Sequence, residues 1–449
     1  MTRILLIYPY FRPGHNRSAF RFPPLGLGYL ASSLEKNGYH PRILDCTFLT
    51  PEDAFQRAKE AKADIVGIYS MVTMRSVSLM FARRLRDRCD LLVAGGPLPS
   101  CDPSSFWDDF DIVVKGEGES AIVEIVQAYE TDSGYDKIAG LAYRQGDRAI
   151  ETRKRELQLD LDQIPFPSRN LFPNRMYMDH WKRHFGYSAT TVMTTRGCPF
   201  SCEFCSNAVF GTSYRERSSE NVLNEVEEAL ALGYERIHFA DDVFTLNKKR
   251  IVQICDGIQS RGMDFKWECL GRVDSIDKTT AVAMKRAGCD RILFGIESGD
   301  GSTLGLMGKR ISLEQAERAI EAARSAGLKT GAFFILCYPG ENDDSVLKTI
   351  RFATSLPLDY LSFTMPYPLP GTRLFERVKN KSVRDWDGRT SLLSDHTLTF
   401  ESEFSEFKMK FAILKGQVQF GLQKRLGRGS FLVNRPFEML TDKVFRIMK

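Results

Sequence analysis

The chain has 449 residues, 43% of them hydrophobic and 27% charged, so it is long enough for two large folded units and is not a disordered polypeptide. Its net charge of +5 is small for this length and argues against a nucleic-acid-binding protein, which usually carries a stronger basic excess. Its apolar runs, such as Ile4–Tyr10, are far shorter than the ~20 residues that cross a bilayer, and the amino terminus is typical of a buried strand rather than a signal peptide. We therefore expect a cytoplasmic protein without a membrane span.

Residues 1–130 alternate short apolar strands with amphipathic helices. Strands that are apolar throughout predict a parallel sheet covered on both faces, and five of them fit a doubly wound, Rossmann-like domain of the flavodoxin type. The expected strands are Ile4–Tyr8, Arg42–Asp45, Asp64–Tyr69, Leu91–Ala94 and Asp111–Val114, and the expected helices are Leu25–Lys36, Pro51–Lys62, Ser76–Arg88 and a last one that ends near Tyr129. Ligands of such a sheet bind at the loops after the strands, here Pro9–Pro24, Ser70–Met74, Gly95–Ser100 and Lys115–Ser120.

Residues 131–187 read as a connector, with one short strand at Leu141–Arg144 and no assigned function. His180 and His184 lie four residues apart on either side of Trp181. A metal-binding pair is one interpretation. A packing or surface role is favoured, because no third ligand is close in the sequence.

Residues 188–398 repeat strand and helix six times, which predicts a partial (β/α)6 barrel with its chemistry on the loops after the strands. The expected strands are Thr191–Thr194, Arg236–Phe239, Lys266–Cys269, Arg291–Phe294, Thr330–Leu336 and Tyr360–Met365, and the helices between them are Glu220–Leu232, Lys248–Arg261, Lys278–Ala287, Leu313–Ala326 and Asp344–Ser355. Residues 399–449 form a helical carboxy-terminal region that is basic over Lys408–Arg428, and we expect it to cover the barrel mouth. Its aromatic and basic residues, from Phe404 to Phe420, are read first as a packing helix, with a substrate wall or a docking surface as alternatives.

Three of the ten cysteines, Cys198, Cys202 and Cys205, lie within eight residues directly after the first barrel strand. The spacing C-x3-C-x2-C lets one loop present three thiolates to three different irons of a 4Fe-4S cluster, which leaves the fourth iron open for a substrate. A structural zinc site is the alternative, but such a site takes four ligands and the next Cys or His is His238. The second alternative to an iron-sulfur cluster is that buried cysteines lie close together here by chance. The remaining cysteines are expected to be small core residues without disulfides: Cys46, Cys89, Cys101, Cys255, Cys269, Cys289 and Cys337.

The segment Arg196–Cys205, RGCPFSCEFC, resembles the signature of the radical S-adenosylmethionine (SAM) superfamily. The resemblance extends over most of residues 1–400, to the subgroup that carries an amino-terminal cobalamin-binding domain and includes the anaerobic magnesium-protoporphyrin ester cyclase and hopanoid methylases. It rests also on FADDVFT (239–245), ECLGRVD (268–274), GCDRILFGIESG (288–299), CYPGE (337–341) and PLPGT (368–372). It implies that a 4Fe-4S cluster on the three cysteines binds SAM at its open iron and cleaves it reductively to a 5′-deoxyadenosyl radical.

Polar residues that follow the barrel strands are the candidates for binding SAM. Carboxylates suit its ammonium end, an arginine can hold its carboxylate bidentately, and Phe204 offers an apolar wall for adenine. Two alternatives stay open: Asp242 could cap the next helix, and Arg272 could pair with Asp274 at the surface. The candidates are Phe204, Asp241, Asp242, Arg272, Glu297 and Ser298.

Small residues after strands of the first unit would let a cofactor approach the backbone, and the resemblance makes Ser70, Gly95, Gly96 and Gly118 candidates for binding cobalamin. The sequence departs from many cobalamin proteins because it has no D-x-H-x-x-G motif. Leu98 also stands where relatives often carry histidine. Bound cobalamin would then have no histidine below its cobalt, and the first unit could instead be a scaffold.

Three functions follow from these patterns. The leading hypothesis is a cobalamin-dependent radical SAM methylase that acts on an unactivated carbon of a small molecule. The alternative is a cobalamin-independent radical dehydration, cyclisation or rearrangement, and the third is a non-catalytic iron-sulfur sensor or scaffold. The resemblance also implies an electron donor such as flavodoxin or ferredoxin. By analogy alone, the substrate is expected to be a secondary metabolite, a lipid or a tetrapyrrole.

Overall fold

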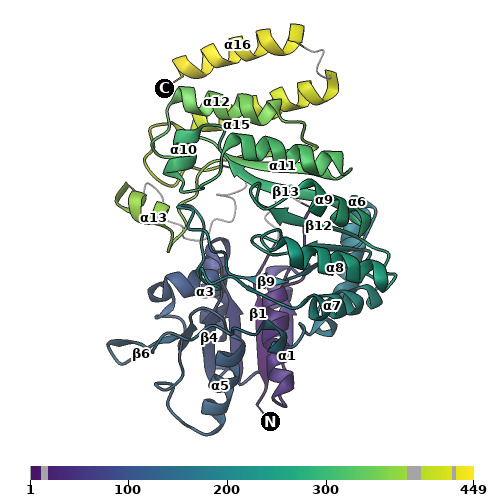
Figure 1. The fold of residues 1–449 in the computed structure, drawn as a ribbon. Helices are drawn as coiled ribbons and strands as arrows, with labels where there is room; N and C mark the ends of the chain where they lie inside the picture. The colour runs from purple at the N-terminus through teal and green to yellow at the C-terminus, as the bar shows by residue number, and fades with distance from the viewer. Residues whose placement is uncertain (1, 12–18, 382–395, 427–430, 449) are drawn as a thin grey trace.

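Two large β-sheets, one wholly and one mainly parallel, organise the chain in the computed structural model, which describes residues 2–11, 19–381, 396–426 and 431–448 (Figure 1). The first sheet, purple to blue, lies at one end of the molecule, and the second, teal to green, lies beyond it. The carboxy-terminal helices, drawn in yellow, pack at the far end of the second sheet. Part of the predicted loop Pro9–Pro24 falls on residues 12–18, and the end of the predicted helix Lys408–Arg428 falls on 427–428, outside the described residues.

The first sheet has the strand order β2-β1-β3-β4-β5-β6-β7, and its first five strands are parallel in the order expected of a flavodoxin-like domain. The five predicted strands are confirmed because their residues are buried almost throughout. The strands are β1 Ile4–Tyr8, β2 Arg42–Asp45, β3 Ile65–Tyr69, β4 Leu91–Gly95 and β5 Ile112–Val114, and the helices are α1 Leu25–Lys36, α2 Pro51–Glu60, α3 Arg75–Leu85, α4 Pro97–Cys101 and α5 Glu119–Glu130.

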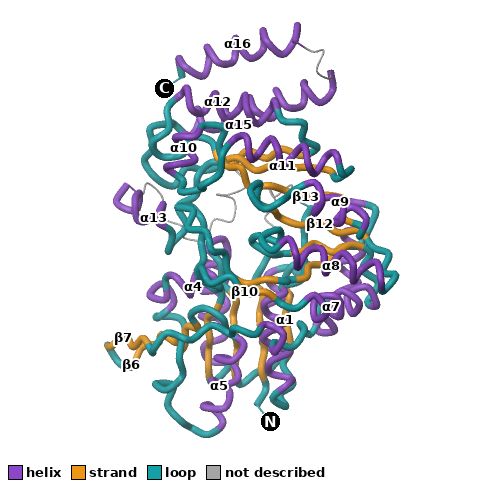
Figure 2. The backbone as a smooth tube through the Cα atoms, in the orientation of Figure 1, coloured by secondary structure: helices purple, strands orange, loops and turns teal. Residues whose placement is uncertain are grey.

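A hairpin that the sequence did not reveal extends this sheet. Strands β6 Leu141–Gln145 and β7 Arg148–Glu151 are antiparallel to each other, and β6 is antiparallel to β5 (Figure 2). Only Leu141 and Ala142 of the hairpin are buried, against the edge of β5. The predicted strand Leu141–Arg144 is confirmed as β6, but its partner β7 and its pairing with the first sheet were not predicted, because the apolar pattern of the hairpin is too short to show them.

The second sheet is a six-stranded parallel sheet, with the order β15-β14-β13-β12-β11-β8, flanked by helices as predicted for a partial barrel. Each helix from α7 to α12 begins after a Ser, Asn or Asp whose side chain accepts a backbone N–H of the first turn. The strands are β8 Ala189–Val192, β11 Arg236–Phe239, β12 Lys266–Gly271, β13 Cys289–Glu297, β14 Lys329–Ile335 and β15 Tyr360–Thr364. The helices are α7 Ser219–Ala231, α8 Lys248–Ser260, α9 Lys278–Arg286, α10 Gly301–Leu306, α11 Leu313–Ser325, α12 Asp343–Ser355 and α13 Arg373–Val378.

The carboxy-terminal helices α15 Glu406–Leu426 and α16 Phe431–Ile447 pack on the outside of the barrel rather than over its mouth. Helix α15 lies against α12 and the edge strand β15, which confirms the packing role. The expectation that this region covers the mouth does not hold for the two helices, but Phe400, which precedes them, is buried with Tyr338 and Leu374 beside Phe204 of the cysteine loop. Buried Lys415 pairs with Asp442 at 3.0 Å, which ties α15 to α16. No helix of the described ranges is long and apolar enough to cross a membrane.

Helix α6 Asn174–Phe185 connects the two units and carries the histidine pair. His180 Nε2 is 2.7 Å from the carbonyl oxygen of Ala19, and His184 Nδ1 is 2.8 Å from that of His180. Among the described residues, no three His, Cys, Asp or Glu side chains gather as ligands of one metal ion. His180 is buried and His184 is exposed, so the favoured prediction of a packing or surface role fits both histidines.

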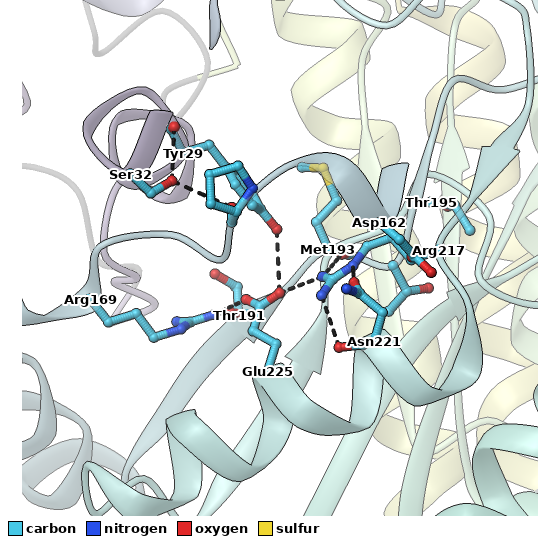
Figure 3. Close-up of polar contacts among 12 residues, drawn as sticks. Tyr29, Ser32, Asp162, Arg169, Thr191, Met193, Thr195, Arg217, Asn221 and Glu225 are labelled. Carbon is cyan, nitrogen blue, oxygen red and sulfur yellow. Dashed lines mark hydrogen bonds and ion pairs between the residues drawn. The ribbon is translucent and has the colours of Figure 1, made fainter. Parts of the chain in front are cut away.

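A buried carboxylate joins the two units (Figure 3). Glu225 of α7 is 0% exposed and pairs with Arg169 of the connector and with Arg217. Its other neighbour is the hydroxyl of Tyr29 on α1, 3.5 Å away. Residues from the first unit, the connector and the barrel therefore all contact the carboxylate of Glu225.

Candidate functional site

The loop that carries the three cysteines is closed at its base by a two-stranded ladder. Strand β9 Thr195–Arg196 pairs antiparallel with β10 Arg215–Glu216, so residues 197–214 form one excursion beyond β8. Gly197 has a φ of +79°, and a Cβ there would lie 2.2 Å from the carbonyl oxygen of Ser213. Only glycine fits this turn, which immediately precedes Cys198.

Contacts from the far side of the barrel hold the loop between its second and third cysteines. The backbone N–H of Glu203 donates to the carbonyl of Met307 at 2.9 Å, and the N–H of Leu374 donates to the carbonyl of Glu203 at 2.9 Å. The hydroxyl of Tyr338, after β14, donates to the Glu203 carboxylate at 2.7 Å. Phe204, a predicted adenine wall, packs edge-on against Tyr338 with 6.5 Å between ring centroids. The loop is therefore fixed by β9, α10, α13 and the segment after β14.

The three thiols share a negatively charged environment with Asp242. Cys205 lies at the open side of the loop, but packing removes enough water from its Sγ to raise its pKa to about 12, and the charges of Asp242, Cys198 and Cys202 add to the shift. Burial likewise raises the pKa of Cys198, and Asp242 and Cys202 contribute. Three thiolates so placed need positive charge beside them, which the irons of a cluster supply.

Two cations flank the thiols. Arg272, after β12, is buried, donates to Asp274 through two hydrogen bonds of 2.9 Å, and has its guanidinium carbon 3.5 Å from the ring centroid of Phe200 in the cysteine loop. Lys309, after α10, lies 3.1 Å from Glu297 Oε1, and its carbonyl accepts from Arg272 at 3.3 Å. The predicted pairing of Arg272 with Asp274 is confirmed, but it is buried rather than superficial. Lys309 was missed because no motif marks it.

The structure separates the two neighbouring aspartates after β11. Asp241 is 1% exposed and its carboxylate accepts from the backbone N–H groups of Thr194 and Thr195, at 2.6 and 2.9 Å, and from the Thr194 hydroxyl at 2.6 Å. Asp241 therefore fixes the turn between β8 and β9. Asp242 is exposed on the thiol side, and it does not cap α8, because Asn247 does. Ser298 is buried beside Thr349, 2.9 Å from its hydroxyl.

A cavity of about 490 Å³ lies at the carboxyl edge of the first sheet, between the two units. From the first unit it is lined by Tyr8, Phe22 and the loops after β4 and β5, which include the predicted residues Gly95, Gly96 and Gly118. From the second unit it is lined by Met193, Arg196, Val209, Phe210 and Ala240. The same stretch of chain that holds the cysteines therefore forms one of its walls.

The lining suits a large, mostly apolar cofactor. A Cβ on Gly95 would meet open space, whereas Gly96 has a φ of +114° and a Cβ there would lie 2.6 Å from the carbonyl oxygen of Ser70. Ser70 does not line the cavity, but it is 0% exposed and its hydroxyl has no hydrogen-bond partner among the described residues. No histidine lines the cavity within those residues, and Leu98 is buried in the first core.

Buried ion pairs cross the same boundary, and sequence reasoning missed them. Arg215 donates to Glu117 through bonds of 2.6 and 3.1 Å, and Arg196 donates to Glu119 at 2.5 Å. Both acidic residues belong to the GEGE loop after β5, which the sequence marked only as small and turn-forming. These pairs fasten the base of the cysteine loop to the rim of the cavity.

Known proteins share both halves of this arrangement. Residues 192–353 match the family model "Radical SAM superfamily", and residues 15–126 match "B12 binding domain". The chain is 36% identical to an uncharacterized methyltransferase of Pyrococcus horikoshii, over 90% of this chain and 89% of the relative. It is 27% identical to the anaerobic magnesium-protoporphyrin IX monomethyl ester cyclase of Cereibacter sphaeroides, over 84% and 64% of the two chains.

Two solved structures have the same fold. The cobalamin-dependent SAM radical enzyme OxsB superposes with a TM-score of 0.78 at 16% identity, over 99% of this chain and 72% of that one. The radical SAM methyltransferase TsrM from Kitasatospora setae superposes with a TM-score of 0.72 at 19% identity, over 85% and 75% of the two chains. The pairing of the two units is thus common to all three proteins.

Proposed function

This chain belongs to the radical SAM superfamily, in the branch with an amino-terminal B12-binding domain, and from that membership we propose that it is a cobalamin-dependent radical SAM methylase of a small molecule. The observation that carries the proposal is the cavity of about 490 Å³ with walls from both units. A cofactor held there by the glycine loops after β4 and β5 faces the unit that holds the cysteines. Methylation requires the methyl donor and the substrate radical to lie close together, and in this proposal the cavity between the two units brings them together.

We propose that Cys198, Cys202 and Cys205 hold a 4Fe-4S cluster whose fourth iron takes SAM. Bound, the cluster supplies the electron that cleaves SAM, and cobalamin supplies the methyl group. In this proposal Arg272 binds the SAM carboxylate; its contact with Phe200 of the cysteine loop supports the assignment, and SAM would have to share or replace its bonds to Asp274. Glu297 and the exposed Asp242 suit the ammonium end.

Asp241 has a different task in this proposal. Its hydrogen bonds to Thr194 and Thr195 leave it no exposed surface for SAM, so it keeps the turn before the cysteine loop in place. Phe204 and Ser298 help to shape the site through Tyr338 and Thr349. The domains in this proposal are residues 1–130, 188–398 and 399–449, with a connector at 131–187. The hairpin β6–β7 belongs to the connector in sequence and extends the first sheet in the structure.

Anaerobic reconstitution with iron, sulfide and hydroxocobalamin, followed by reduction with SAM, tests this function. A methylase retains cobalamin and forms both S-adenosylhomocysteine and 5′-deoxyadenosine. Deoxyadenosine without retained cobalamin would overturn the methylase and support the cobalamin-independent alternative. If neither product forms with a panel of candidate small molecules present, the radical chemistry itself is refuted.

The proposal also implies an electron donor and a cellular compartment for the protein. The reductive step takes one electron per SAM cleaved, so the protein works with an electron donor such as flavodoxin or ferredoxin. The low potential of such clusters suits the reducing cytoplasm, where the exposed Cys205 is kept from forming a disulfide and can bind iron.

A further inference from the structure

A basic surface lies beside the cysteine loop, and none of its residues lines the cavity between the two units. It contains the exposed Arg310, Arg373 and Arg377, the exposed Leu306 and Ser201 of the loop itself, and we call it the arginine rim. A hollow of about 360 Å³ lies within it, lined by Ser201, Arg310 and Arg373 and by residues of α10. Nothing in the proposed methylation uses this surface.

The arginine rim is in direct contact with the segment between the cysteines. The guanidinium of Arg373 donates to the carbonyl of Ser201, which stands next to Cys202 in the chain. A Cβ on Gly308, at the end of α10, would lie 3.3 Å from the same carbonyl. Arg377 lies 3.4 Å from the carboxylate of Glu203, on the other side of Cys202. A protein seated on the rim would therefore contact the exposed Ser201 and, on the other side of Cys202, the arginine that pairs with Glu203.

The charge of the rim suits an acidic partner. Within the described residues, neither Arg310 nor Arg373 forms an ion pair with a carboxylate, so their charges face the solvent. Leu306, 43% exposed, gives the rim a small apolar centre. Transient electron-transfer encounters use small interfaces in which complementary charge steers association, and a few apolar contacts suffice to hold them.

We propose that the arginine rim is the docking surface for a small acidic electron-transfer protein, such as a flavodoxin, that reduces the cluster. The proposal rests on the proposed function, because only a reductive enzyme needs the electron. In the step, the docked donor is oxidised by one electron and the cluster is reduced by one. Electron tunnelling weakens steeply with distance, so the donor has to dock where the cysteine loop reaches the surface, and the rim is such a place.

Binding of flavodoxin to the full chain tests the proposal without relying on turnover. Arg310→Glu is expected to raise the Kd by about fivefold at low ionic strength and to flatten its salt dependence, while Arg310→Lys restores most of the affinity. Arg57→Glu, on the outer helix α2, makes the same change of net charge far from the rim and should bind as the wild type does. Arg373 is left intact, because its bond to Ser201 supports the loop.

Two results would overturn the docking site: an unchanged Kd for Arg310→Glu, or an equal loss for Arg57→Glu. Deoxyadenosine formation adds a second comparison. With a chemical reductant Arg310→Glu should match the wild type, and with flavodoxin it should be slower. Equal losses with both reductants would show that the variant damages the cysteine loop, and the rim would then not be a docking surface. A wild-type protein that binds flavodoxin but makes no deoxyadenosine with either reductant would instead refute the proposed function.

Discussion

Replacing Glu225 by glutamine should destabilise the folded chain by about 3 kcal/mol. The carboxylate lies between Arg169 and Arg217, whose side chains are 4% and 6% exposed, and losing one member of a buried ion pair typically costs about 3–5 kcal/mol. We expect the lower end of that range, because each arginine keeps other acceptors. Arg169 still donates to the carbonyl of Thr191 at 2.7 Å, and Arg217 still donates to that of Met193 at 2.8 Å.

Urea denaturation followed by tryptophan fluorescence measures this change, since Trp181 and Trp267 are buried in the connector and in the barrel. The control is Asp277→Asn, which removes the charge from a half-exposed pair with Lys248 but keeps an N-cap for α9, so it should cost less than about 1 kcal/mol. A Glu225→Gln midpoint within the error of the wild-type value would refute the reasoning. It would mean that the two arginines find solvent or new partners when the charge is gone.

Three further outcomes are expected. Cys202→Ala should lose the absorbance of the iron-sulfur cluster and all SAM cleavage, whereas Cys255→Ala, a core thiol of α8, should keep both. Burial raises the pKa of Glu341 to about 7. Between pH ~4.5 and ~7 the folded state therefore binds more protons than the unfolded state, and the free energy of unfolding falls by about 3 kcal/mol as pH rises through that window. Urea titrations of Glu341→Gln should lack this slope, and an identical slope would exclude Glu341 as its source. Gly95→Leu, whose side chain enters the cavity, should weaken cobalamin retention in gel filtration but leave the cluster intact, unlike Gly421→Leu on α15, which should keep both.

The strands of both sheets could be predicted because each buried strand coincides with a local run of apolar residues. Strand β1 and helix α1 begin and end where the pattern changes, at Ile4–Tyr8 and Leu25–Lys36. The strand predicted at Thr191–Thr194 is displaced, since Thr194 bonds to Asp241 and leaves the sheet. What was missed depended on distant partners: the strand β6 was predicted but its pairing with the edge of β5 was not, and neither was the packing of α15 against α12 and β15.

The candidate site was predictable to the extent that its chemistry follows spacing. Three cysteines in one loop predict a cluster. The different roles of the two adjacent aspartates could not be predicted, because they depend on the bond of Asp241 to Thr194 and on the place of Asp242 beside the thiols. Lys309 reaches Glu297 only because the chain turns after α10, and such a contact has no local signature. The ion pairs from Glu117 to Arg215 and from Glu119 to Arg196 span 98 and 77 residues, and sequence spacing carries no information on them.

The cavity between the units has a consequence for protein engineering. Its glycine edge comes from the first sheet, but Met193, Arg196 and Phe210 belong to the second unit, and buried ion pairs from Glu117 and Glu119 hold the two together. A transplanted first domain would carry only one side of the binding surface. Chimaeras that exchange the first domain should therefore move residues 1–130 together with the stretch from β8 through β10, so that both walls of the cavity and the ion pairs between them come from one protein.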